Sequence, residues 1–286
     1  MSDLLPAHYR LSTKSAILGD VRRSALPLRL LRLLTIFVVA AVPLSRAQIP
    51  QSDPKAVAIV MQASLALTGG TTVNDATLTG TATSIAGSTR ETGTVTLIFA
   101  GLSFSRIDLQ LDSGSSSEIR NNSGAPNGGV VDPKGNYHQL PLHNCFNPPA
   151  WFSPLGWVQA GLTTNAVLSY IGSETRGGVA VDHVRSYLGV DPTNPTANLQ
   201  QKLSTFDLYL DASSHLPLAV EFNTHPYDDA GRDIPSEVRF NDYRLIGQVD
   251  TPFLIQKLSQ GSLQLEIAVS GANTNSGVSP TQFQLQ

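Results

Sequence analysis

The sequence predicts an α+β protein that is mainly antiparallel β-sheet, with a few helices packed on one face of the sheet. Three observations support this prediction. Short runs of alternating apolar and polar residues recur along the chain, as in antiparallel sheets with one dry and one wet face. Charged residues make up only 14% of the chain, which also contains 23 glycines and 18 prolines, a composition suited to many turns. One early segment has helical periodicity instead.

The N-terminal segment, residues 1–47, has the parts of a secretory signal peptide. Arg22, Arg23, Arg29 and Arg32 precede the apolar run LLTIFVVAAVPL, and small residues follow it up to Ala47. The run spans 12 residues, whereas a membrane-spanning helix needs about 20. We therefore expect export to the periplasm or outer envelope, cleavage near Ala47 and no stable membrane span, with a retained membrane anchor as the alternative. Residues 48–286 would then form a single binding domain.

Removal of this segment leaves an acidic protein. The segment holds seven of the 19 basic residues and two of the 22 acidic residues, so 12 basic and 20 acidic residues remain, for a net charge of −8. An acidic domain without a basic cluster is a poor ligand for nucleic acid, and we expect no nucleic-acid partner. Cys145 is the single cysteine, so stability must come from core burial rather than from an internal disulfide. We expect a monomer.

The best helix candidate is residues 54–67, PKAVAIVMQASLAL. Pro54 suits the first turn of a helix, and Gly69 and Gly70 follow its end. Apolar residues recur near the helical period at Ile59 and Val60 and on either side of them. This face of the helix is predicted to pack against the sheet.

The period then changes to two, which predicts strands. Alternating apolar positions occur in six segments, and turn signals such as SGSSS, DPKGN and DASS separate strands from one another. The segments are TVTLIFA (94–100), SRIDLQLD (105–112), STFDLYLD (204–211), LPLAVEF (216–222), SEVRFNDYR (236–244) and SLQLEIAV (262–269). In LPLAVEF, we expect Leu216, Leu218, Val220 and Phe222 to share one face. The segments predict a large meandering sheet.

The middle of the chain differs from the sheet regions. Residues 140–162, LPLHNCFNPPAWFSPLGWVQAGL, contain both tryptophans, two phenylalanines and four prolines. The prolines exclude a long helix, although a short helix near 155–161 fits the pattern. We interpret this stretch as a cover over the dry face of the sheet, and an ordinary packed loop is the alternative. Residues 191–201 are interpreted as a polar excursion at the sheet edge.

No strong catalytic motif is present. A serine hydrolase needs an activated serine, a histidine and an acid, yet no G-x-S-x-G segment occurs. His183 and His215 are candidate bases only because histidines are few. We interpret both as turn or surface residues and predict that the protein is not an enzyme.

Metal ligands are equally scarce. His138, His143 and Cys145 lie close in sequence and would suit zinc, but the usual paired spacing is missing. Cys145 is better interpreted as a small buried apolar residue. Three acidic residues in HPYDDAGRDIP lack the ligand spacing of a calcium loop. We predict no metal site and no cofactor.

The last third of the chain resembles the periplasmic lipoprotein-carrier (LolA/LolB-like) superfamily, which includes outer-membrane lipoprotein-sorting proteins. The resemblance rests on three stretches: FDLYLDASSHLPLAVEF (206–222), VRFNDYRLIGQVDTPFLIQKL (238–258) and IAVSGANTNSGVSPTQF (267–283). It implies an unclosed, half β-barrel with helices covering its concave apolar face. A lid arginine of the kind found in these carriers cannot be placed in this sequence.

The dry face and the resemblance together define the expected site. The expected apolar lining is Val95, Leu97, Phe99, Leu109, Leu111, Leu208, Leu210, Leu218, Val220, Phe222, Phe240, Leu265 and Ile267. The expected cover residues are Ile59, Val60, Trp151, Phe152, Leu155 and Trp157.

Three functions remain open on the sequence. The first is a non-catalytic carrier or chaperone whose cavity binds the acyl chains of a lipid or lipoprotein. The second is a signalling or scaffold module of the same fold that binds another envelope protein. The third, less favoured, is a secreted hydrolase.

Overall fold

The computed structural model describes residues 50–285, so the predicted signal segment lies outside the described residues. Most of the described chain is strand. The strands are β1 (Asp75–Ala86), β2 (Thr89–Ala100), β3 (Phe104–Leu111), β4 (Gly114–Asn121), β5 (Gly128–Val131), β6 (Tyr137–Gln139), β7 (Ala166–Arg176), β8 (Val179–Leu188), β9 (Phe206–Asp211), β10 (Pro217–Thr224), β11 (Ile234–Ile246), β12 (Val249–Ser259) and β13 (Ser262–Thr274). The helices are α1 (Pro54–Thr68), α2 (Pro154–Gly161) and α3 (Ala197–Ser204), with 3-10 turns η1 (Leu142–Cys145) and η2 (Pro280–Phe283).

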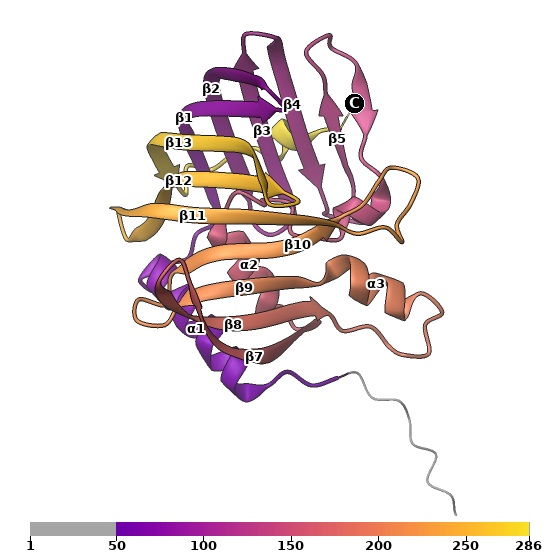
Figure 1. Cartoon of the computed structure of the whole chain (residues 1–286), viewed down its shortest axis with the longest axis vertical. Coiled ribbons are helices and arrows are strands. Elements are labelled where there is room, and N and C mark those ends of the chain that lie inside the picture. The colour runs from indigo at the N-terminus through magenta and orange to yellow at the C-terminus, as the bar shows by residue number, and fades with distance from the viewer. Residues whose placement is uncertain (1–49, 286) are drawn as a thin grey trace, which may run out of the picture. The chain divides into compact units, whose positions relative to one another are not determined.

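All 13 strands form one antiparallel sheet, in the order β6-β5-β4-β3-β2-β1-β13-β12-β11-β10-β9-β8-β7. Strands that follow one another in sequence are neighbours, except β6 and β7, which form the two edges. The first and last strands also pair, β1 with β13, where Ala76 lies opposite Thr274. The sheet is therefore two meanders joined by the first and last strands, as Figure 1 shows. It stays open between β6 and β7. This confirms the predicted mainly antiparallel α+β fold and the unclosed half-barrel.

Helix α1 begins and ends where its sequence predicts. The Asp53 carboxylate accepts a hydrogen bond from the Lys55 backbone N–H at 2.8 Å, and Pro54 occupies the first turn. Gly69 ends the helix in a left-handed conformation with φ 57°, which glycine adopts without strain. The face made of Ala56, Ile59, Val60, Ala63 and Leu67 is buried.

The residues before α1 protect the open edge of β7. The Asp53 backbone N–H donates to the Leu168 carbonyl at 2.8 Å, and the Leu168 N–H donates to Ser52 Oγ at 3.0 Å. These bonds satisfy backbone groups that an edge strand would otherwise expose. They also position α1 along the inside of the sheet.

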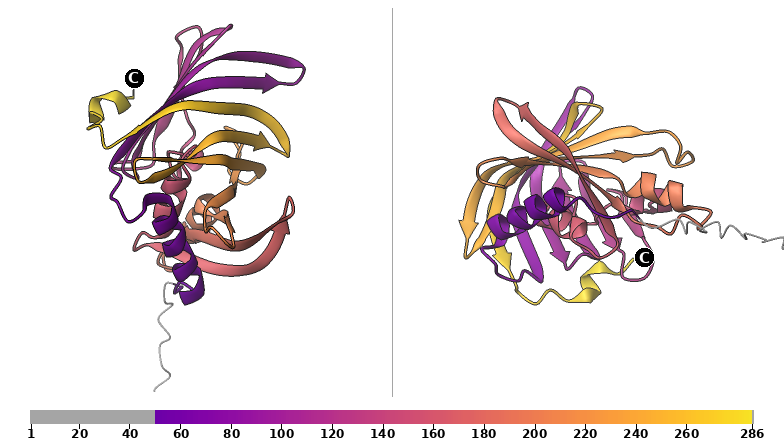
Figure 2. Two further views of the ribbon diagram at one scale, coloured as in Figure 1. Left: turned by 90° about the vertical axis from the view of Figure 1, so that its left-hand side faces the viewer. Right: turned by 90° about the horizontal axis from the view of Figure 1, so that it is seen from below.

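The segment that joins β6 to β7, residues 140–165, connects the two open edges and carries η1 and α2. Pro154 and Ser153 begin α2, with the Gly156 N–H donating to Ser153 Oγ at 3.4 Å. Helices α1 and α2 contact each other, and the strands arch over them in Figure 2. We call α1 together with residues 140–165 the cover. No helix within residues 50–285 combines the length and the apolar character needed to cross a lipid bilayer.

The outer face of the sheet carries two small apolar clusters. Ile98, Ile119 and Phe283 form one, where η2 packs on the outside of β2 to β4. This contact explains why Ile98 interrupts an otherwise polar face of its strand. Leu218 belongs to the other cluster, with Val181, Tyr209 and Ala219.

One expected lining residue lies on the other face of the sheet. Leu218 was expected on the dry face, but the pairing of β9 with β10 shifts between Pro217 and Ala219. One extra residue at this bulge turns Leu218 to the outside while Val220 and Phe222 stay inside. Residues 191–201, interpreted as a polar excursion, include the start of α3 at Ala197, and this helix buries Leu203.

Candidate functional site

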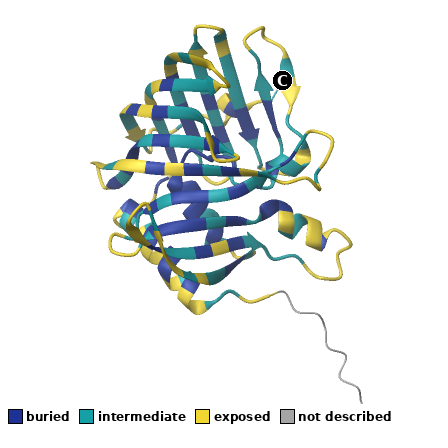
Figure 3. Cartoon of the chain, in the orientation of Figure 1, coloured by how far each residue is buried: buried dark blue, intermediate teal, exposed yellow. Residues whose placement is uncertain are grey.

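The concave face of the sheet is the main apolar surface of the protein. Nine of the predicted lining residues belong to one buried cluster: Val95, Leu97, Phe99, Leu208, Leu210, Val220, Phe222, Phe240 and Ile267. Leu109 and Leu265 are half-buried and pack against it. Leu111 is also half-buried, and it lies on the same face as Leu109, two residues earlier. Figure 3 shows this alternation of buried and exposed positions along the strands.

The cover packs directly onto this face. All six predicted cover residues are buried and belong to the same cluster as the lining. The Trp157 ring lies 5.0 Å from that of Phe206 and 4.9 Å from that of Phe222, measured between centroids. The Phe152 ring lies 6.5 Å from that of Phe99. In this structure the cover therefore fills the part of the concavity that it spans.

Polar contacts fasten the connecting segment at residues 145–149. The Arg120 guanidinium donates to the Asn147 carbonyl at 3.1 Å, and Ser105 Oγ donates to the Pro149 carbonyl at 2.8 Å. Arg120 is 5% exposed, and its Nε has no hydrogen-bond partner within the described residues. This arginine was not predicted from the sequence, because its strand SSSEIRNN does not alternate apolar and polar residues. Burying a guanidinium without all of its hydrogen bonds costs free energy. This attachment of the cover therefore carries an energetic cost.

Trp151 connects the two walls of the half-barrel. Its indole N–H donates to Glu118 Oε1 on β4 at 3.2 Å. The Lys257 ammonium on β12 lies 4.2 Å from the centroid of the same side chain's ring. Strands β4 and β12 are far apart in the sheet order, so the curvature of the sheet brings Glu118 and Lys257 to one indole.

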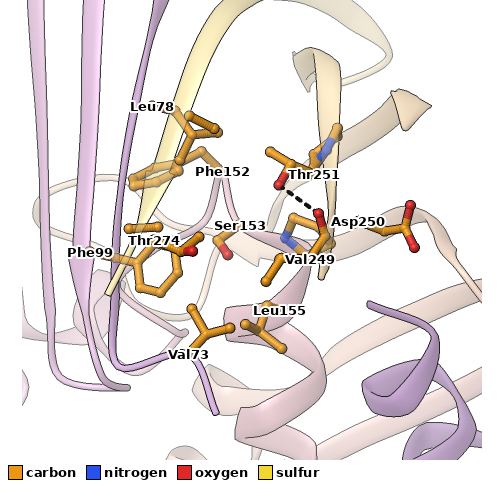
Figure 4. Close-up of a pocket in the computed structure, with 14 residues that line it drawn as sticks. Val73, Leu78, Phe99, Phe152, Ser153, Leu155, Val249, Asp250, Thr251 and Thr274 are labelled. Atoms are coloured by element: carbon orange, nitrogen blue, oxygen red, sulfur yellow. Dashed lines mark hydrogen bonds between the residues drawn. The ribbon is translucent and has the colours of Figure 1, made fainter. Parts of the chain in front are cut away.

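A small apolar cavity lies between the cover and strands β1, β2 and β12 of the sheet. Its volume is about 30 Å³, well below the several hundred Å³ of a typical ligand pocket. Figure 4 shows Leu78 and Phe99 from the sheet, Phe152 and Leu155 from the cover, and Val73 around it. The Asp250 carboxylate points away from this apolar group in the same view.

Several residues of this cavity were absent from the predicted lining. Val73 and Val249 belong to short connections or strand ends, where no alternation is visible. Ala76 and Leu78 lie on β1, whose sequence DATLTGTATSIA contains small and polar residues on both faces. Their pairing with β2, where Ala76 faces Phe99 and Leu78 faces Leu97, fixes them inside. The strong alternation of the neighbouring strand could have indicated their side.

The candidate catalytic and metal-binding residues do not come together. His183 Nε2 lies 2.8 Å from Asp207 Oδ1, with Tyr209 beside it on the outer face. His215 lies between β9 and β10. The two histidines lie on different elements. This arrangement provides a hydrogen-bonded His183–Asp207 pair and a turn residue rather than a nucleophile with its base.

The three residues that were considered as zinc ligands do not share one site. His138 pairs with Asp132 at 3.1 Å, and His143 Nε2 lies 2.8 Å from the Pro226 carbonyl oxygen. Cys145 is fully buried, and this burial raises the pKa of its thiol. Across residues 50–285, no three His, Cys, Asp or Glu side chains gather as a metal site requires.

Comparison with known proteins finds similarity in structure and not in sequence. No protein-family model and no curated protein sequence matches the chain. Solved structures match most of it at low identity. An outer membrane lipoprotein-sorting protein domain from Vibrio parahaemolyticus is 14% identical, with a TM-score of 0.51 over 80% of this chain and 96% of its own.

Two further structures match to a similar extent. A DUF1329 family protein from Desulfovibrio piger is 10% identical, with a TM-score of 0.54 over 82% of this chain and 98% of its own. A LolA superfamily protein from Nitrosomonas europaea is 12% identical, with a TM-score of 0.52 over 80% of this chain and 97% of its own. At this identity the similarity establishes the fold.

Proposed function

The chain has the LolA-like fold, and on that premise we propose that it is an exported envelope protein that binds acyl chains of a lipid or lipoprotein without catalysing a reaction. The observation that carries this proposal is the concave face. It carries a large apolar cluster, and side chains of the cover pack onto that cluster. Residues 48–286 act as one binding domain in the periplasm or outer envelope, after cleavage near Ala47.

Binding requires the cover to move. A cavity of about 30 Å³ has no room for an acyl chain, so the ligand must replace cover side chains on the sheet. This exchange leaves the buried apolar area of the sheet nearly unchanged, because the hydrocarbon of the ligand covers the surface that the cover leaves. Phe152 and Leu155 are the first residues to be replaced, since they border the cavity.

A matched pair of substitutions on β13 tests this proposal. Ala272 lines the cavity, and Ala268 is exposed on the other face of the same strand. Ala272→Phe fills the site where the acyl chain starts to enter and is expected to weaken binding of monopalmitoylglycerol at least tenfold. Ala268→Phe adds the same ring outside and is expected to change binding less than twofold.

Binding is measured by the emission of the two tryptophans, Trp151 and Trp157, which belong to the cover. Mass spectrometry of protein purified from its native envelope provides an independent check, because bound lipid should be carried with it. A protein that takes up no acyl probe and is recovered without lipid would refute the carrier proposal.

The small size of the cavity favours a second function, a signalling or scaffold module. In that case the interior is a permanent core and an exposed face binds another envelope protein. A single protein recovered by affinity capture from envelope extract, equally by the wild type and by Ala272→Phe, is the result expected from this alternative.

A further inference from the structure

We propose that the ligand is a lipid with a zwitterionic head group of the phosphoethanolamine type, and that Lys257 and Glu118 bind its phosphate and its ammonium after Trp151 moves away. This inference rests on the proposed function. It adds the chemical class of the head group and names the two side chains that recognise it.

The position of Lys257 is unusual for a lysine. In the sheet register it lies opposite Val238 on one side and Leu265 on the other, and Val238 is fully buried in the core cluster. Its side chain therefore lies on the concave face, where it is half-buried.

Lys257 has no carboxylate within ion-pair distance among the described residues. Its ammonium instead lies over the Trp151 ring at 4.2 Å. Such an interaction offsets only part of the cost of removing a charge from water. The ammonium is thus held by a residue of the cover and by no residue of the sheet.

Glu118 depends on Trp151 in the same way as Lys257 does, but it carries the opposite charge. It lies opposite the buried Ile107 in the pairing of β3 with β4, so it also projects into the concavity. Its carboxylate accepts the Trp151 indole N–H at 3.2 Å and makes no ion pair with a described residue. One cover side chain therefore satisfies two opposite charges on two walls.

Displacement of the cover frees both charges together. When Trp151 leaves, Lys257 and Glu118 both lose the indole that they contact, and the half-buried Leu265, opposite Lys257, stays on the same face. A head group with a phosphate next to an ammonium replaces both interactions of the indole with charge-assisted hydrogen bonds. A purely anionic head group satisfies Lys257 but faces Glu118, and a neutral head group satisfies neither.

Three probes with one identical palmitoyl chain test this inference: lysophosphatidylethanolamine, lysophosphatidylglycerol and monopalmitoylglycerol. Affinities are measured from the tryptophan emission of the full chain. We expect the ethanolamine lipid to bind at least tenfold more tightly than the other two. Lys257→Gln should remove this preference, because both phospholipids then bind more weakly relative to monopalmitoylglycerol.

The variants at Glu118 separate charge recognition from a general loss of structure. Glu118→Gln should weaken the ethanolamine lipid and strengthen the glycerol phospholipid. The double exchange Glu118→Lys with Lys257→Glu keeps both charges and should restore a preference for the ethanolamine lipid. Lys134→Gln, at an exposed position in the turn between β5 and β6, removes the same charge elsewhere and should change nothing.

The outcomes distinguish the two proposals. If all three probes bind equally, or if Lys257→Gln leaves their ranking unchanged, the head-group inference is wrong while acyl binding stands. If none of the probes binds, the proposed function fails, and this inference fails with it.

Discussion

At the scale of single residues, Asp211 shows how one carboxylate fixes the turn between β9 and β10. Its Oδ1 accepts the Ser213 hydroxyl at 2.7 Å and the backbone N–H groups of Ser213 and Ser214 at 2.8 and 2.7 Å. The hydroxyl bond is the largest cause that lowers the pKa of Asp211, from 3.8 to about 2. The charged form is therefore the one that the folded turn prefers.

This shift predicts a loss of stability in acid. Because the folded pKa is below the unfolded one, the stabilisation is fully present about one pH unit above 3.8 and is lost as the pH falls through about 2. Between pH 4 and pH 2, the free energy of unfolding of Asp211→Asn should fall less than that of the wild type, by about 1 kcal/mol after allowance for solvent screening.

Urea unfolding at several pH values measures this difference. Ser213→Ala removes one of the three bonds and should lie between the wild type and Asp211→Asn. Identical acid dependence in the wild type and in Asp211→Asn would contradict the assignment.

Single residues also show where the sequence predicts side-chain direction and where it does not. Alternation placed Val95, Leu97 and Phe99 correctly, because their strand pairs without interruption on both sides. It failed for Leu218, since a bulge depends on the partner strand and leaves no mark in the bulged sequence. Arg120 and Lys257 were missed for another reason. A charge on the concave face contradicts the pattern used to recognise that face.

At the scale of elements, η2 illustrates a helix turn that stabilises the sheet from outside. Phe283 is fully buried, and its ring stacks on that of Phe104 at 5.3 Å between centroids. Its cluster, with Ile98 and Ile119, lies across the sheet from the concave face.

Removing this ring should therefore affect stability and not binding. Phe283→Ala is expected to lower the free energy of unfolding by about 3 kcal/mol, the usual cost of such a truncation, with acyl affinity within twofold of the wild type. Phe152→Ala, on the inner side, should lower stability by a similar amount and also change the acyl affinity. Urea unfolding and tryptophan emission measure the two quantities. Equal effects of both variants on binding would contradict this separation of the faces.

The elements that were predicted well are those with a strong local signal. Helix α1 has both its start and stop residues, and α2 is fixed by Ser153 and Pro154 in a segment whose other prolines exclude helix. Helix α3 was missed because ANLQQKLS is mostly polar and buries few residues, and its N-terminal Thr196 makes no side-chain capping bond. Its burial of Leu203 is a tertiary interaction, which a local pattern does not reveal.

At the scale of the whole molecule, the sequence predicts a covered half-barrel but not the volume left under the cover. That volume depends on how closely Phe152 and Leu155 fit against Val73 and Leu78. A side chain that is larger or smaller by one methyl group is enough to change this volume, because protein interiors are closely packed. A mostly filled concavity and an empty one have the same apolar pattern.

If the ligand replaces cover side chains on the sheet, amide hydrogen exchange should change in the cover when the ligand binds. Adding lysophosphatidylethanolamine should speed amide hydrogen exchange in residues 150–157, because the cover separates from the sheet. Exchange in β12 and β13 should slow or remain unchanged. Mass spectrometry of peptic fragments measures this, with Ala272→Phe as the control that binds weakly. Protection that rises equally in the cover and in the sheet would instead indicate a ligand bound outside a closed protein.

The pairing of β1 with β13 has a consequence for the order of folding. It joins segments about 201 residues apart, as the bond from the Asn74 N–H to Asn275 shows, whereas the other strand pairs are hairpins or near neighbours in sequence. Each meander can assemble as soon as its own strands are available, but the seam must wait for the C-terminal strand. Until then two long unpaired edges stay exposed to other chains, so the newly made protein is most prone to aggregate just before its last strand arrives.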